Sequence, residues 1–231
     1  MSENVFWQGQ AELDILYIVV FLGWGLSLIL ALLLPGLTLV ALESYRYKRT
    51  DAIGLYIGRF LPYSLFDTLV SLTRALFITS TLLAYLRGEP WWAVHGGGER
   101  LLLYHLLGVL ALMSLDLLRR GSYALWAYTF MPPLAARHLD ADRLMISYAT
   151  LPLLLMLPLA AMQAALSLPA LIALISVLGL GSLLRIVQVF RRLVGSSDGY
   201  VYVFLYLCTH ELLPWATVAL IVRFASQGVL G

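Results

Sequence analysis

Four ionisable residues stand inside stretches that are otherwise apolar, and their types are the ones that could do chemistry. Arg74 interrupts the run 62–86, and Glu211 interrupts the run 200–223. Each lies near the middle of its run, so the two charges would meet if both runs formed helices at the same depth. A charge at that depth costs roughly 2.5–3.5 kcal/mol on insertion scales, and such residues normally face other helices and pair. We expect an Arg74–Glu211 ion pair, either as a structural pair or as a relay for protons or substrate.

His210 and Asp67 complete this first group. His210 adjoins Glu211, and Pro214 lacks the N–H that the carbonyl of His210 would need in a helix. Such a carbonyl is tolerated where protein or water satisfies it. Asp67 precedes Arg74 by a spacing that puts both on roughly the same helix face. For His210, the alternative to a ligand is a hydrogen-bonded histidine of the core.

A second tier of candidates comprises Asp116, Arg185 and His105. Asp116 stands close to Arg119 and Arg120, and Arg185 is placed to meet either acid. For Asp116 and Arg185 the alternative is an interfacial position, because a long arginine side chain reaches the headgroups. His105 lies near the outer end of its run, at a different depth from His210, which argues against a bis-histidine haem site.

Composition indicates which elements must position these residues. The 231 residues are 61% hydrophobic and 12% charged, with a mean hydropathy of +0.87. Soluble domains average about 25% charged residues, so a bilayer is the expected solvent. The net charge of +2 does not favour nucleic acid. No signature of a cofactor, metal or catalytic site is evident, which favours a non-enzymatic protein without excluding an intramembrane enzyme.

We therefore predict an all-α integral membrane protein with one helical transmembrane domain over 15–223. About twenty apolar residues are needed for each span. A shorter aromatic stretch, 121–137, is broken by Pro132 and Pro133 and is expected to lie in the interface or to be re-entrant. The tails 1–14 and 224–231 are expected outside. The six expected spans are 15–42, 62–86, 101–118, 144–165, 170–190 and 200–223.

The basic residues indicate the orientation. Lys and Arg are enriched in cytoplasmic loops of membrane proteins. With the N-terminus outside, most of the fifteen Lys and Arg residues fall on the cytoplasmic side. Six spans with both termini in the periplasm are consistent with this bias.

The stretch from Tyr206 to Pro214, YLCTHELLP, resembles the closing Y-L-C-x-x-E-[IL]-L-P signature of a bacterial membrane family. That family is known as a domain of unknown function, number 4271. The resemblance covers about 37–223 and singles out Tyr206, Cys208, Glu211 and Pro214, whereas His210 occupies a slot that is often apolar in the family. It implies a bacterial inner-membrane location and no established activity.

Three functions follow as hypotheses. The first is a non-enzymatic component of a larger cell-envelope complex, whose partners are the lipid bilayer and either other membrane subunits or further copies of itself. The alternative is a small proton-linked transporter or channel that uses Arg74, Glu211 and Asp67, since buried ionisable groups beside a broken helix recur in transport sites. The third is an intramembrane enzyme acting on a lipid or a quinone.

Overall fold

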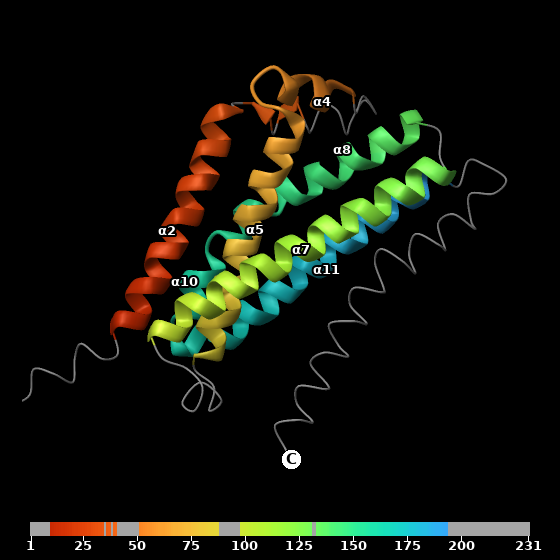
Figure 1. Cartoon of the computed structure of the whole chain (residues 1–231). Coiled ribbons are helices and arrows are strands. Elements are labelled where there is room, and N and C mark those ends of the chain that lie inside the picture. The colour runs from red at the N-terminus through yellow and green to blue at the C-terminus, as the bar shows by residue number, and fades with distance from the viewer. Residues whose placement is uncertain are drawn as a thin grey trace, which may run out of the picture.

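A computed structural model describes residues 10–34, 36–37, 39–40, 51–87, 98–130 and 133–193. All regular structure within these ranges is helical, in agreement with the predicted all-α class. Short helices, namely α4 (Asp51–Gly58), α9 (Leu151–Leu154), α10 (Leu157–Ala161) and η1 (Ala164–Leu166), join the long ones. The five long helices are α2 (Gln10–Leu33), α5 (Tyr63–Leu86), α7 (Gly98–Phe130), α8 (Pro133–Ala149) and α11 (Ser167–Leu193) (Figure 1).

Four of the long helices have the length and composition to cross a membrane. Their apolar windows are Leu13–Leu33, Tyr63–Leu86, Arg100–Leu125 and Ser167–Phe190. They correspond to the first, second, third and fifth expected spans. The sixth expected span, 200–223, lies outside the described residues, so the described part of the chain supports four spans and not the predicted count of six.

The fourth expected span, 144–165, is not one continuous helix. Pro152 stands in the first turn of α9, and Pro158 stands in the first turn of α10. Proline has no N–H to donate and clashes with the preceding turn, so each ends the helix before it. Gln163 then adopts an extended backbone before η1. The segment 144–165 is therefore the end of α8 followed by three short turns.

The third expected span, 101–118, is part of a longer helix. Helix α7 runs without interruption through Arg119, Arg120 and Gly121 to Phe130. Arginine favours helices, and one interior glycine costs only about 1 kcal/mol relative to alanine. The helix ends just before Pro132 and Pro133, because the residue preceding a proline is pushed out of the helical region. Residues 121–130 thus extend α7, and residues 133–137 open α8.

The first helix ends earlier than expected. It begins at Gln10, inside the expected tail, and ends at Leu33, before Pro35. Gly36 has a φ of 90°, a conformation that only glycine adopts without strain. The amide of Val40 then donates to the carbonyl of Gly36 at 2.9 Å. This turn leads the chain from α2 towards α4.

Helix α5 is the centre of the bundle. It contacts α2, α7, α10 and α11, and 56% of its apolar window is buried, against 17% for the windows of α7 and α11. Close approach to α7 depends on Gly108, where an added Cβ would lie 2.6 Å from Thr79 Cγ2. Helix α5, which is rich in Ser and Thr side chains, is therefore the apolar window that its neighbours cover most.

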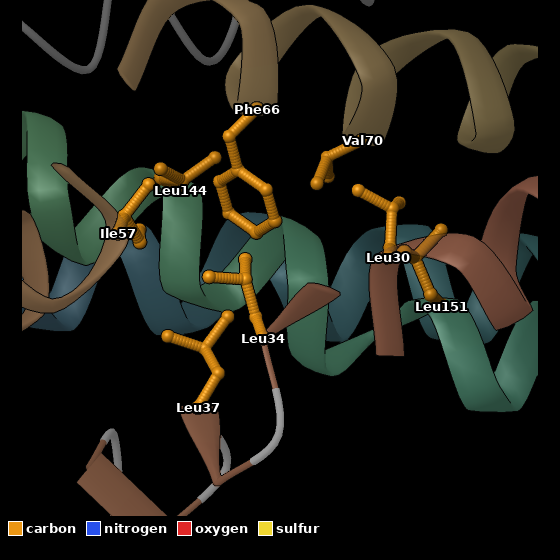
Figure 2. Packing of buried hydrophobic residues seen from close by; sticks show 8 residues of the cluster. All are labelled: Leu30, Leu34, Leu37, Ile57, Phe66, Val70, Leu144 and Leu151. Atoms are coloured by element: carbon orange, nitrogen blue, oxygen red, sulfur yellow. The ribbon is translucent and has the colours of Figure 1, made fainter. Parts of the chain in front are cut away.

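The largest apolar cluster among the described residues lies at the α4 end of α5 and joins five helices. Phe66 and Val70 of α5 meet Leu144 of α8, while α2, α4 and α9 supply the other members. Figure 2 shows these side chains converging between the helices. The full cluster is Leu30, Leu34, Leu37, Ile57, Phe66, Val70, Leu144 and Leu151. Because Phe66 and Leu144 adjoin Asp67 and Arg143 in sequence, this packing fixes the backbone beside the charged residues.

Candidate functional site: a charged network between three helices

Asp67 of α5 is held by two arginines from other helices. Its Oδ2 atom lies 2.7 Å from Arg120 Nη1 of α7 and 2.7 Å from Arg143 Nη2 of α8. Arg120 Nη2 also donates to the backbone carbonyl of Asp67 at 3.3 Å. The Asp67 side chain is only 9% exposed. Both arginines that contact this carboxylate are far away from Asp67 in the sequence, so the two ion pairs connect α5 to α7 and to α8.

Asp116 of α7 belongs to the same network. Its carboxylate forms an ion pair with Arg120 one turn later, and Ser71 Oγ donates to Asp116 Oδ2 at 2.8 Å. Arg143 Nη1 lies 3.9 Å from Asp116 Oδ1. Arg120 also contacts Ser71 Oγ. Two carboxylates and two guanidinium groups thus balance in charge at one end of the bundle.

Helical spacing explains how the three helices present these groups. Asp67, Ser71 and Arg74 follow one another at intervals of four and three residues along α5. Asp116 and Arg120 are four residues apart on α7, as are Arg143 and Ser147 on α8. Residues three or four apart lie on one face of a helix. Each helix therefore contributes a polar stripe. Together the three stripes comprise Asp67, Ser71, Arg74, Asp116, Arg120, Arg143 and Ser147.

Arg74 lies seven residues beyond Asp67, or roughly 10 Å along the helix. Its Nη1 atom donates to Ser147 Oγ of α8 at 3.0 Å. Among the described residues, its Nε atom is buried without a hydrogen-bond partner, and no carboxylate forms an ion pair with it. Arg74 is therefore bound to the network's helices through a neutral hydroxyl.

Arg185 and His105 lie apart from Asp67. Arg185 of α11 contacts Ser182 Oγ through Nη2 at 3.2 Å and acts electrostatically on Arg74. His105 of α7 is buried, and within the described part of the chain neither of its ring nitrogens has a hydrogen-bond partner. The structure thus brings Asp67 and Asp116 together, places Arg74 beside them along α5, and leaves His105 outside the network.

The other sequence-predicted candidates cannot be placed. Glu211, His210, Tyr206, Cys208 and Pro214 all lie outside the described residues. The Arg74–Glu211 pair therefore stays a prediction.

Arg120 and Arg143 are the charged members of the network that were not predicted as site residues from the sequence. They were interpreted only as basic residues of cytoplasmic segments. A signal was present in the four-residue spacing of Asp116 with Arg120 and of Arg143 with Ser147. Their shared partner, Asp67, is far from both in sequence, so the sequence alone offers no link between them.

This arrangement holds α5, α7 and α8 together through charged contacts. Asp67 receives two charge-assisted contacts, and each of them connects α5 to another helix. A nucleophile paired with a base is not found among the described residues of the network. Two arginines of the network, Arg74 and Arg120, each have a buried Nε atom without a hydrogen-bond partner among the described residues.

A comparison with protein families gives one match. Residues 26–221 match the family described as a domain of unknown function (DUF4271). Comparison with curated proteins and with solved structures finds no match. Since the match extends over most of the 231 residues, this chain belongs to the DUF4271 family.

Proposed function

We propose that the chain is a non-enzymatic, membrane-embedded component of a larger assembly in the bacterial inner membrane. The observation that carries this proposal is that Asp67 and Asp116 both form ion pairs with arginines. These buried pairs lie between α5, α7 and α8. Buried charges that form ion pairs between neighbouring helices specify how those helices pack. They support a scaffold more than a reaction centre.

The outer faces of α7 and α11 support the same proposal. Their apolar windows are the least buried of the four. Leu106 and Leu110 of α7 and Leu183 of α11 are each more than half exposed. An apolar helix face of this kind packs stably against lipid tails or against the helices of another subunit. We propose that these faces are where partner subunits bind.

We further propose six spans with both termini in the periplasm. The distribution of arginines supports this orientation. Arg120 and Arg143 meet Asp67 at the α4 end of the bundle, and Arg59 directly follows α4. Arg87 and Arg100 border the opposite end, where α5 ends and α7 begins. The excess of basic residues at the α4 end supports a cytoplasmic position for that end.

Affinity purification from native membranes in mild detergent tests the main proposal. We expect partner subunits to copurify with the tagged chain at a fixed ratio. Leu106→Trp on the exposed face of α7 should reduce that yield by blocking a neighbouring helix, whereas Leu28→Trp on exposed α2 is the matched control and should not. Recovery of the chain only by itself or as a self-oligomer contradicts the proposal.

Proton-linked transport is a second candidate, and Arg74 is the observation that favours it. A guanidinium whose described partner is a neutral hydroxyl is able to bind a substrate or respond to a proton on a nearby acid. The purified chain, reconstituted in vesicles under a proton gradient, should then carry a proton flux, and the substitution Glu211→Gln should abolish that flux. Absence of flux from the wild type under any gradient removes this candidate.

A further inference from the structure

The corner between α4 and α5 carries large apolar side chains that the bundle leaves uncovered. Leu55 is 70% exposed, and Phe60, two residues after α4 ends, is 50% exposed. Ile57 lies between them in the sequence and is fully buried in the apolar cluster at this end of α5. Helix α4 is therefore fixed to the bundle through Ile57, while other apolar side chains of the same short segment stay outside.

Backbone hydrogen bonds and a ring contact define this corner. The amides of Phe60 and Leu61 both donate to the carbonyl of Ile57 at 3.0 Å. The ring of Phe60 packs against the ring of Tyr56, with 5.3 Å between the ring centroids. Pro62 follows at the start of α5 with a φ of −54°, which its ring restricts. The exposed position of Phe60 therefore belongs to a defined turn.

Arg59 adds a positive charge to the same surface. It is exposed, it follows Leu55 by one helical turn, and it directly precedes Phe60. Within the part of the chain that the structure describes, no carboxylate forms an ion pair with Arg59. A guanidinium matches the oxygens of a phosphate, and its long stem lies readily along apolar surface. The corner thus combines two apolar side chains with a cation that no described acid neutralises.

The position of this corner along α5 indicates what covers it. The apolar window of α5 begins at Tyr63, only a few residues after Phe60. Figure 1 places α4 at the end of the bundle, next to the start of α5. A helix α5 that crosses a bilayer puts its first residues at the boundary between acyl chains and headgroups. Apolar side chains beside an arginine suit that boundary, because the apolar groups enter the acyl chains and the cation stays at the phosphates.

We infer that the corner formed by Leu55, Arg59 and Phe60 binds anionic phospholipid at the membrane interface. Leu55 and Phe60 pack among the acyl chains, and Arg59 binds the headgroup phosphate. The interfacial segment expected at 121–137 is thus assigned to α4 instead, since residues 121–130 continue α7. The inference rests on α5 crossing a membrane and is independent of the proposed assembly, so either can fail without the other.

Spin labels measure the depth of the corner in the full-length chain, reconstituted in vesicles of phosphatidylglycerol and phosphatidylcholine. Cys208→Ser removes the native cysteine, and Leu55→Cys or Phe60→Cys then carries the label. We expect both labels to be more accessible to dissolved oxygen, which concentrates among acyl chains, than to a water-soluble nickel complex. Leu106→Cys, on the exposed face of α7, is the membrane-buried reference. Greater access to nickel, or shielding from both reagents, would place the corner in water or beneath protein and overturn the inference.

Lipid-selective quenching tests the role of the charge. A fluorophore at Phe60→Cys should be quenched by brominated phosphatidylglycerol in preference to brominated phosphatidylcholine, with a selectivity of about fivefold for one arginine at a membrane surface. Arg59→Gln should remove this selectivity, and Arg59→Lys should keep it. Arg87→Gln, at the opposite end of α5, is the matched control and should leave it unchanged. An absence of selectivity with Arg59 in place, its survival in Arg59→Gln, or its loss to added inorganic phosphate at constant ionic strength overturns the inference.

Discussion

Asp67 and Arg74 share one face of α5, yet their surroundings differ in a way that separates two roles. Asp67 has two arginines at 2.7 Å, one from α7 and one from α8. Arg74, two turns further along, has a serine hydroxyl at 3.0 Å. Opposite ends of one polar stripe therefore differ in role. The end at Asp67 holds three helices together, and the end at Arg74 retains the capacity to bind an acid.

The largest expected effect comes from neutralising Asp67. Asp67→Asn leaves Arg120 and Arg143 to share Asp116 as their carboxylate in the described network, and removing one partner of a buried ion pair costs about 3–5 kcal/mol. The free energy of unfolding in mixed micelles should fall by that amount. Asp14→Asn, at an exposed position of α2, is the control and should change little. A loss below about 1 kcal/mol at Asp67 would erase the distinction between the two ends of the stripe.

An intermediate effect is expected where α5 and α7 approach most closely. Gly108→Ala puts a methyl group 2.6 Å from Thr79 Cγ2, and Thr79 is buried and branched at Cβ, so it has little freedom to move. Overpacking of this kind costs about 1–3 kcal/mol. The distance between α5 and α7 should increase, and this also weakens the ion pair between Arg120 and Asp67.

Gly121→Ala provides the control for Gly108→Ala, because nothing lies within 4 Å of the added Cβ. It should leave stability unchanged or raise it by up to about 1 kcal/mol through helix propensity. Equal effects of the two substitutions on the unfolding midpoint would mean that α5 and α7 are not in close contact at Thr79.

The smallest effect is expected at the hydroxyl that serves Arg74. Ser147→Ala removes one hydrogen bond between α5 and α8, and such bonds between helices in membranes contribute about 0.6 kcal/mol on average and at most about 1.7 kcal/mol. Ser176→Ala on exposed α11 loses only a bond to its own helix and should have less effect. A loss at Ser147 as large as that at Asp67 would make the two ends of the stripe equivalent.

The sequence could predict much of the helical framework because length and apolar composition are local properties. The windows of α2, α5, α7 and α11 fall within or around the expected spans for that reason. Pro152 and Pro158 are visible in the sequence, but whether a proline bends or ends a helix depends on the packing around it. Gly121 showed the converse, since a residue that often ends helices lies inside α7.

The charged network was less predictable. Asp67, Arg74 and Asp116 could be selected because charges in apolar runs are conspicuous. Arg143 could not, because it stands in a polar part of the sequence and its significance comes from Asp67, whose carboxylate lies 2.7 Å away on another helix. Contacts between residues so far apart in the sequence depend on how α8 turns back along the bundle, and no local pattern specifies that return.

One measurement tests the central claim, that Asp67 is the point at which α5 and α8 are fixed. Unfolding of Asp67→Asn, Arg143→Gln and the double variant is compared with the wild type in the same micelles. The contact at 2.7 Å predicts that the double variant loses less stability than the two single variants combined, by about 1.5 kcal/mol or more. Independent, additive losses would contradict the claim, because they would show that Asp67 and Arg143 do not depend on each other.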